Sequence, residues 1–381
     1  MFSSSEWWRY LDTDIHRDAT PGAAPGGDGR HGMARLSRAE AQQRTREKVL
    51  AAARTEFLER GYRATKIDAI AERAELTRGA VYSNFPSKRA LYFAVLGAAA
   101  MTDAPDAEPT ATSPREALAE FARAWTARLP LWTDDDRSPS RLGVDLLPEI
   151  MADERTRWPY AQLMKLNALL LGLALENLAF AHLRTRTGRR VRIAESALTT
   201  LHGATQLAAA APGFVEPFDV VRSCAQLADL DLDDAWLPPH LPYAVRPRPV
   251  DERWSPPPGG PSGGVVAILG LHRLGAVEEA VRATPPGTDV TLVLVSSDPG
   301  ELSALARLAL AEVETCLRAA FPPTALPRLA VLHDDTGALA AAAGVPAVSD
   351  ATEAAILIRD GRIVARAEGF GACHAAATAA T

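Results

Sequence analysis

The 381-residue sequence predicts an all-α protein over its first two-thirds and a separate α/β domain at its C-terminal end. From Ser37 to about Asp229, apolar residues recur at helical spacing, without the alternation typical of strands. After a proline-rich stretch, short apolar runs alternate with helical segments, which is typical of an α/β domain. Three widely spaced cysteines exclude a disulfide framework and a four-cysteine zinc site. They suit a reducing cytoplasm.

The N-terminal segment and the longest apolar run carry no sign of a membrane protein. Residues 1–32 are rich in Gly, Ser, Pro and Asp, and we expect a disordered tail without a signal peptide. Met33 is an alternative start of translation. The apolar run 166–181 contains Asn167 and Glu176, which favours a buried core helix over a membrane span.

Residues 37–101 form the candidate DNA-binding domain. Apolar residues recur every four positions from Val49 to Phe57 on one helix. The segment 65–68 is typical of a capping box that opens a second helix. Thr77 is a suitable N-cap for a third helix, and the last two helices are short and joined by a tight turn. These features predict a helix-turn-helix.

Local charge agrees with DNA binding, although the net charge of the whole chain, 41 − 47 = −6, would argue against it. Residues 33–101 hold 13 basic and 7 acidic residues, so this region has a net charge of +6. Basic residues neutralise phosphates and release counterions, which supplies most of the sequence-independent affinity for DNA.

The motif from Ala74 to Lys88, Ala-Glu-Leu-Thr-Arg-Gly-Ala-Val-Tyr-Ser-Asn-Phe-Pro-Ser-Lys, closely resembles the signature of TetR-type transcriptional repressors. The lead-in from residue 44 to residue 53 and the Thr65 segment also match. One departure is Glu75, where the family often has Gly in the turn. The resemblance implies a DNA-reading headpiece followed by helices that bind a small ligand and form a homodimer.

Motif and chemistry together predict which residues contact DNA. Arg78 and Ser83 would reach base edges, and Thr77 would cap the recognition helix beside a phosphate. The resemblance places Tyr82 and Lys88 on phosphates. For an isolated helix, a solvated surface would be the simpler interpretation of these charges. The full predicted set is Arg44, Arg46, Thr65, Lys66, Thr77, Arg78, Gly79, Ala80, Tyr82, Ser83, Asn84 and Lys88.

The region 113–230 is the predicted ligand-binding and dimerisation domain. The resemblance nominates helices 158–184 and 190–210 as the dimer interface, through Leu170, Leu173, Leu198 and Leu201. A ligand pocket needs apolar walls and a few polar anchors. The candidates are Phe121, Trp125, Trp132, Trp158, Met164, Glu176, Asn177, His182 and His202, although ordinary packing or exposure explains each of them singly. The histidines lack metal-ligand spacing, so no metal site is expected.

The α/β domain, 264–381, follows a predicted linker at 231–263. Nine prolines between residues 237 and 261 exclude a helix or a central strand and predict a semi-rigid tether. Asp360-Gly361 predicts a type I′ hairpin. Strands are expected at 265–269, 290–295, 329–332, 354–358 and 363–367, with helices near 275–283, 300–320 and 336–343.

Residues 331–345 and 355–366 resemble the second half of a thioredoxin-like domain of the alkyl hydroperoxide reductase type. Such enzymes place a reactive cysteine after the first core strand, but the segment 269–275 holds His272 and no cysteine. Cys316 lies among acidic and apolar residues that should raise its pKa. We therefore expect a fold kept for binding or dimer support, without redox catalysis.

The sequence thus predicts a cytoplasmic, homodimeric, ligand-responsive regulator, a repressor of an inverted-repeat operator in double-stranded DNA. It is not expected to be an enzyme or to use a cofactor. One alternative is a thioredoxin-like oxidoreductase tethered to a DNA-binding domain, and another is a partner-docking module on the same tether. Because headpiece and helical domain precede the linker, deleting residues 262–381 is expected to leave a dimer that binds DNA.

Overall fold

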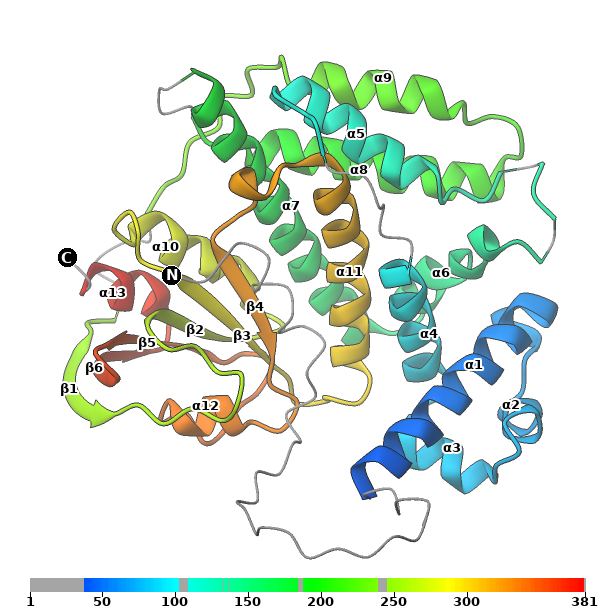
Figure 1. The fold of residues 1–381 in the computed structure, drawn as a ribbon, viewed down its shortest axis with the longest axis horizontal. Helices are drawn as coiled ribbons and strands as arrows, with labels where there is room; N and C mark the ends of the chain where they lie inside the picture. Colours follow the sequence, from blue (N-terminus) through cyan, green and yellow to red (C-terminus); the bar gives the residue numbers. More distant parts are fainter. Residues whose placement is uncertain are drawn as a thin grey trace, which may run out of the picture.

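The computed structural model describes residues 38–102, 109–131, 133–135, 137–183, 188–238 and 245–379. The predicted tail at 1–32 lies outside these residues. The described chain forms a helical part and an α/β part that lie side by side, with one long helix of the α/β part standing between them (Figure 1).

The helices of the first two-thirds lie close to their predicted positions. Helix α1 changes direction at Gly61, which has a φ of 74°, a value that favours glycine. The elements are α1 (Arg38–Ala64), α2 (Ile67–Arg73), α3 (Arg78–Asn84), α4 (Lys88–Thr102), α5 (Pro114–Thr126), the 3₁₀ helix η2 (Pro139–Gly143), α6 (Leu146–Met151), α7 (Glu154–Leu183), α8 (Val191–Ala210) and α9 (Pro217–Leu227).

Helix α7 is a core helix. Its segment Glu154–Ala181 is long and apolar enough to cross a membrane, but 72% of its most apolar window is buried inside the protein. Asn167, whose polarity argued against a membrane span, donates a hydrogen bond to the Ala309 carbonyl at 2.9 Å. The burial agrees with the core helix predicted from the sequence.

The C-terminal part is a mixed sheet covered by helices. Its strand order is β1-β6-β5-β2-β3-β4; β2, β3 and β4 are parallel, and β5 runs antiparallel to both β2 and β6. The elements are β1 (Arg248–Arg253), β2 (Gly264–Gly270), η4 (Leu274–Ala276), α10 (Val277–Ala283), β3 (Val290–Val295), α11 (Leu302–Ala320), η5 (Pro323–Ala325), β4 (Leu329–His333), α12 (Ala338–Ala342), β5 (Glu353–Arg359), β6 (Arg362–Glu368) and α13 (Ala372–Thr378).

The strands predicted from the sequence are all present, and the predicted hairpin is confirmed. Asp360 and Gly361 both have positive φ values, 49° and 70°, as the two central residues of a type I′ turn require. Alternate residues of β2 face two different cores. Ala267 packs in the core that includes α10, α11 and α13, whereas Ile268 packs in the core that includes α12.

The predicted linker at 231–263 is wrong in its second half. Residues Arg248–Arg253 form β1, which pairs antiparallel with β6 at the edge of the sheet. An edge strand accommodates Pro249 because only one side of the strand donates to a neighbour. Trp254 is buried, and its indole Nε1 donates to the Pro261 carbonyl at 2.6 Å. The proline-rich stretch is therefore largely built into the α/β part.

The expectation of a free-standing C-terminal module also differs from the structure. Helix α11 packs against α4, α5 and α7 of the helical part (Figure 1). Leu305, Leu308 and Val313 are all buried, and they belong to one continuous core that runs from α1 to α13. The physical reason is that α11 is apolar on two faces, so it covers the sheet with one and the helices with the other.

Candidate DNA-binding interface

Packing fixes the headpiece, α1 to α3, against the start of α4. The ring of Phe57 lies 5.4 Å from that of Tyr92 between centroids, and the ring of Tyr62 lies 4.4 Å from it. Ile70 on α2 and Val81 on α3 are fully buried. These contacts hold the two short helices of the predicted helix-turn-helix at a defined angle to α1.

The turn before α3 explains the one departure from the family motif. Glu75 has a φ of 56°, in the left-handed region that glycine enters without a steric penalty. A non-glycine residue there costs about 1 kcal/mol, which this chain tolerates. Two residues later, the Thr77 hydroxyl accepts a hydrogen bond from the Ala80 amide at 3.2 Å. The predicted N-cap of the recognition helix is thus present.

The exposed side of α3 brings together three of the predicted DNA-contacting side chains. The Arg78 side chain is 61% exposed, and its guanidinium lies 5.5 Å from the Tyr82 ring centroid. Tyr82 is 40% exposed, and Ser83 is exposed beside it. Arg78 also lies 3.6 Å from the carboxylate of Asp68, so this ion pair would have to open when the arginine reaches a base.

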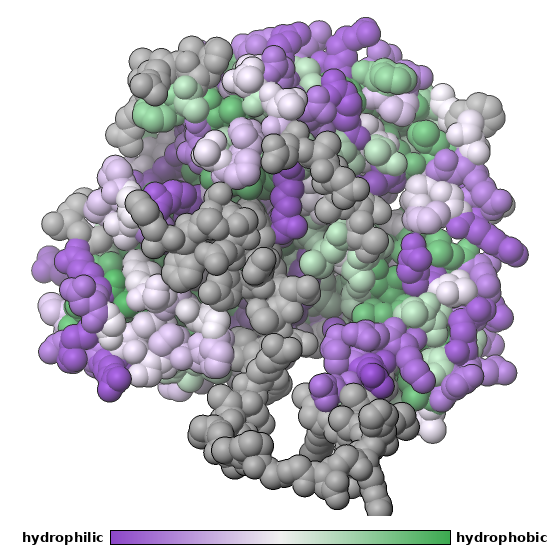
Figure 2. Space-filling view, viewed as in Figure 1, coloured by the Kyte–Doolittle hydropathy of each residue, from purple (hydrophilic) through white to green (hydrophobic). Residues whose placement is uncertain are grey.

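The small residues Gly79 and Ala80 leave the middle of α3 uncrowded. A Cβ at Gly79 would meet only the Thr77 hydroxyl, at 3.8 Å. Arg44 on α1 and Lys66 at the start of α2 are exposed. Hydrophilic side chains gather over the headpiece in the space-filling view (Figure 2). The exposed residues of the predicted set are thus compatible with a nucleic-acid surface.

Arg46 and Asn84 form contacts within the headpiece. The Arg46 guanidinium lies 4.4 Å from the Phe85 ring centroid and donates to the Asn84 carbonyl at 3.2 Å. The Asn84 side chain in turn donates to the Ala80 carbonyl at 2.9 Å. These contacts tie the end of α3 to α1, so both residues position the recognition helix in this structure.

The prediction for Thr65 needs correction. This residue is buried, and its hydroxyl donates to the carbonyls of Glu56 at 3.0 Å and Gly61 at 2.7 Å. The predicted capping box is also wrong, because Lys66 is the N-cap of α2 and makes no side-chain cap bond. In this structure Thr65 therefore stabilises the bend between α1 and α2.

Lys88, which the resemblance places on a phosphate, makes contacts within the headpiece in this structure. Its ammonium lies 4.4 Å from the Tyr62 ring centroid and donates to the Arg63 carbonyl at 3.3 Å. Burial lowers the pKa of Lys88, and the nearby carboxylates of Glu149 and Asp145 oppose this shift. A phosphate would have to draw this side chain out of its contacts.

The predicted ligand residues that the structure describes lie in several different surroundings. Phe121, Trp125 and His202 do cluster in the core, where Trp125 meets His202 edge to face at 4.8 Å. Met164 is half-buried, and Trp158 is 56% exposed on the surface. The side chains of Trp132 and His182 lie outside the described residues.

Two predicted ligand anchors bind the α/β part instead. Glu176 accepts two hydrogen bonds from Arg282 of α10, at 2.5 and 2.7 Å. Asn177 donates to the carbonyls of Ala325 and Leu326, at 3.2 and 3.3 Å. Two of the predicted ligand residues are thus in contact with the α/β part.

The predicted dimer residues are largely core residues of a single chain. Leu173, Leu198 and Leu201 are buried within the protomer, and Leu170 is half-buried. The apolar density of α7 and α8 has a different cause from the expected one. These helices pack against each other, α7 also packs against α11, and α8 packs against α5 and α9. Of the four predicted dimer residues, Leu170 keeps the most exposed surface.

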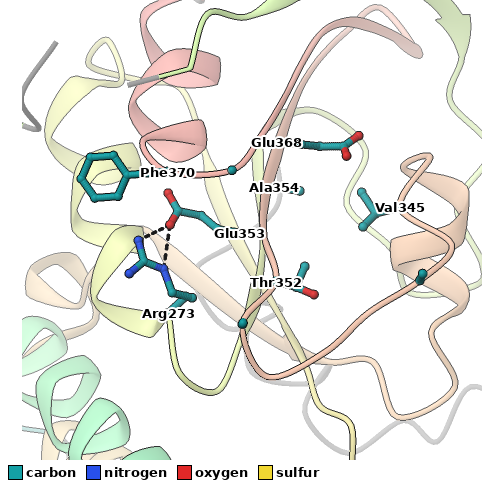
Figure 3. Close-up of a pocket in the computed structure, with 10 residues that line it drawn as sticks. Arg273, Val345, Thr352, Glu353, Ala354, Glu368 and Phe370 are labelled. Atoms are coloured by element: carbon teal, nitrogen blue, oxygen red, sulfur yellow. Dashed lines mark hydrogen bonds and ion pairs between the residues drawn. The ribbon is translucent and has the colours of Figure 1, made fainter. Parts of the chain in front are cut away.

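A cavity of about 440 Å³ lies in the α/β part. Arg273, from the segment where a thioredoxin-like enzyme would carry its cysteine, forms an ion pair with the buried carboxylate of Glu353 (Figure 3). The same carboxylate accepts from the Gly371 amide at 2.7 Å, and Phe370 also lines the cavity. No group of acidic, histidine and cysteine side chains suited to a metal occurs among the described residues.

The three cysteines are buried and unpaired. Burial raises the pKa of Cys224 and Cys316 to about 11. Burial and the carboxylates of Glu353 and Glu279 raise the pKa of Cys373. The expected shift for Cys316 is confirmed, although burial is its main cause. Cys373 lies in α13 and is buried.

Comparison with known proteins finds a family whose model matches the headpiece and the start of α4. The family model described as "Bacterial regulatory proteins, tetR family" matches residues 49–95. A TetR transcriptional regulator from Rhodococcus sp. RHA1 is 18% identical, has a TM-score of 0.35, and is similar over 51% of this chain and 100% of its own. The transcriptional regulator FadR from Bacillus subtilis, solved with stearoyl-CoA, is 16% identical and has a TM-score of 0.36. The similarity covers 48% of this chain and 96% of FadR. No curated protein matches the chain.

Proposed function

From the match of residues 49–95 to the family model of tetR-type bacterial regulatory proteins, we propose that the chain is a cytoplasmic, homodimeric transcriptional repressor whose operator affinity responds to a ligand. The observation that carries the proposal is the exposed side of α3. There Arg78, Tyr82 and Ser83 lie together on a helix whose N-cap, Thr77, is in place.

We expect one exposed arginine to read a base and the other exposed basic side chains to contact phosphates. Arg78 has the reach and the planar donors to pair with the O6 and N7 atoms of a guanine in the major groove. Lys66 and Arg44 carry charge beside the helix and would neutralise phosphates of the duplex. A homodimer would present two such helices to two half-sites on one face of the DNA, which requires an inverted repeat.

The α/β part supports a regulatory role better than an enzymatic one. We propose that it is thioredoxin-like, in keeping with its two parallel crossovers followed by an antiparallel hairpin. An oxidoreductase would need an accessible thiolate, whereas all three thiols are buried and have raised pKa values. Because α11 occupies a face of the helical part, we place reception of the ligand in the α/β part.

Binding-site selection from random duplexes, followed by fluorescence anisotropy titrations, tests the proposal. The wild-type chain should enrich an inverted repeat. Arg78→Ala should lose about 5- to 150-fold of the preference at one operator position, equivalent to about 1–3 kcal/mol. Arg222→Ala makes the same charge change on the exposed surface of α9 and should bind as the wild type does. Enrichment of no sequence would contradict the proposal.

A further inference from the structure

Glu301 of the α/β part forms hydrogen bonds with two residues at the start of α4. The Ser87 hydroxyl, which caps α4, donates to Glu301 Oε2 at 2.5 Å. The Arg89 guanidinium donates to Glu301 Oε1 at 2.7 Å and to Asp153 at 2.7 Å. The Glu301 and Arg89 side chains are only 12% and 16% exposed, so solvent weakens this pair less than it would a surface pair.

The backbone next to Glu301 touches the headpiece as well. A Cβ added at Gly300 would lie 2.6 Å from the ring of Pro86, so the two loops are in close contact. Pro86 is only two residues from Asn84, the last residue of α3. Movement of this loop toward the headpiece would therefore push directly on the segment between the recognition helix and α4.

Contact continues along the length of α4. A Cβ added at Gly97 would lie 3.5 Å from the Leu308 backbone of α11. Near the other end of α4, the Thr315 hydroxyl donates to the Ala100 carbonyl at 2.9 Å. Helix α4 is thus held at its beginning by Glu301 and at its middle and end by α11, and the headpiece is joined to it directly.

A chain of hydrogen bonds leads from Glu301 back to the cavity. Asp298 accepts from the Glu301 amide at 3.2 Å, and its own amide donates to Ser296 Oγ at 3.0 Å. Ser296 Oγ donates to Asp350 Oδ1 at 2.8 Å, and the Ser297 amide donates to the same oxygen at 3.3 Å. Residues 351–354, which follow Asp350 directly, line the cavity (Figure 3).

We propose that residues 296–301 form a coupling loop, through which the state of the α/β-domain cavity sets the position of the headpiece. The effector signal then enters through the α/β part and reaches α3 by way of Asp350, Glu301 and the start of α4. This inference rests on the proposed DNA-binding function. It differs from a purely structural role, in which these contacts add stability but leave the headpiece unchanged.

Two variants interrupt the chain at separate points. Glu301→Gln keeps the size of the side chain but removes the charge that faces Arg89. Asp350→Asn weakens the hydrogen bonds that Asp350 accepts from Ser296 and Ser297. Asp350 itself belongs to the α/β part and lies outside the headpiece. Asp335→Asn is the matched control, because it removes one carboxylate from an exposed ion pair with Arg307 of α11, away from the coupling loop.

The first measurement is hydrogen exchange in the full chain without DNA. The amides of Ala90 and Leu91 donate to the side chain and the carbonyl of Ser87, so they report on the order of the first turn of α4. In both Glu301→Gln and Asp350→Asn we expect these amides to exchange at least threefold faster than in the wild type. In Asp335→Asn they should exchange at the wild-type rate.

The second measurement is the affinity for a duplex selected by the wild-type chain. We expect Glu301→Gln and Asp350→Asn to change the dissociation constant at least threefold in the same direction, and Asp335→Asn to leave it unchanged. Variants that match Asp335→Asn in both measurements would overturn the coupling loop, even if they unfold more easily. Faster exchange in a chain that binds no duplex would support the coupling while overturning the proposed function.

Discussion

Arg282 of α10 and Glu176 of α7 form a bidentate ion pair that joins the α/β part to the helical part, with N–O distances of 2.5 and 2.7 Å. The two side chains are 17% and 14% exposed. Glu176 also accepts from the Arg190 amide at 3.0 Å, so one carboxylate connects α7, α8 and α10. Like the contacts of Glu301, this ion pair joins the α/β part to the helical part of the molecule.

Replacing Glu176 should loosen this junction. Glu176→Ala leaves Arg282 with only Glu278 as an ionic partner and removes the acceptor of the Arg190 amide. We expect the free energy of unfolding in urea to fall by about 2 kcal/mol. Glu195→Ala, on the exposed side of α8, should change it by less than about 0.5 kcal/mol. Equal effects of the two substitutions would contradict the assigned role.

Thr65 and Lys66 are neighbours in sequence with separable effects. Thr65→Val removes the hydroxyl that donates to the carbonyls of Glu56 and Gly61, and should lower stability by about 1 kcal/mol without altering the salt dependence of DNA binding. Lys66→Ala should leave stability unchanged and reduce the slope of log affinity against log salt by about one unit. Urea unfolding and anisotropy at several salt concentrations measure the two effects.

The cysteines should be inert in the folded chain. Because all three are buried, a thiol reagent such as DTNB should react with fewer than one thiol per chain under native conditions and with all three in denaturant. A variant with Ser or Ala at all three positions should bind the selected duplex as the wild type does. Rapid native labelling of Cys373 would contradict the described burial.

Glu312 on α11 should make stability depend on pH. Burial raises the pKa of Glu312 from 4.5 to about 7, although Arg128 opposes the shift. The folded chain therefore holds a proton that the unfolded chain has released between these pH values. Its contribution to stability is complete below pH 4.5 and is lost as pH rises through 7.

Comparison with Glu312→Gln isolates this contribution, because glutamine mimics the protonated carboxyl at every pH. The difference in unfolding free energy between the variant and the wild type should favour the variant by about 2 kcal/mol more at pH 8 than at pH 5. Urea unfolding at the two pH values measures this. A difference that does not change with pH would show that Glu312 titrates normally in the folded chain.

Deletion of residues 262–381 should not leave a functional dimer, contrary to the expectation from the sequence. The deletion removes α11 and exposes the faces of α4, α5 and α7 that it covers. We expect the truncated chain to bind the dye ANS and to lose its cooperative thermal transition. A soluble, cooperatively folding truncation that binds DNA would show that the headpiece and helical part are independent.

Local features of the fold were predictable because their causes are local. The helix periodicity, the Thr77 cap and the Asp360-Gly361 turn each depend on residues that are close together in the sequence. The exposed face of α3 followed from a contiguous motif. The strand β1 was missed because nine prolines masked a pairing with β6, more than 100 residues away, that is visible only in the folded sheet.

The site residues that the sequence did not reveal act over long separations. Glu301 lies 212 positions from Arg89, and no spacing rule connects them. The apolar residues of α7 and α8 signalled that these helices are covered, but not by what. Leu201 was assigned to a partner chain and is in fact buried within its own protomer. A signal that could have pointed to α11 is its apolar character around most of its circumference.

The position of α11 late in the sequence has a consequence for synthesis on the ribosome. Helices α4, α5 and α7 are complete by residue 183, but residues 302–320 must follow before these helices gain their shared neighbour. At typical bacterial elongation rates that interval is roughly 5–30 s. During it the nascent chain presents apolar helix faces to its surroundings. A chaperone that recognises such faces would encounter this chain at that stage, before the headpiece has a rigid support.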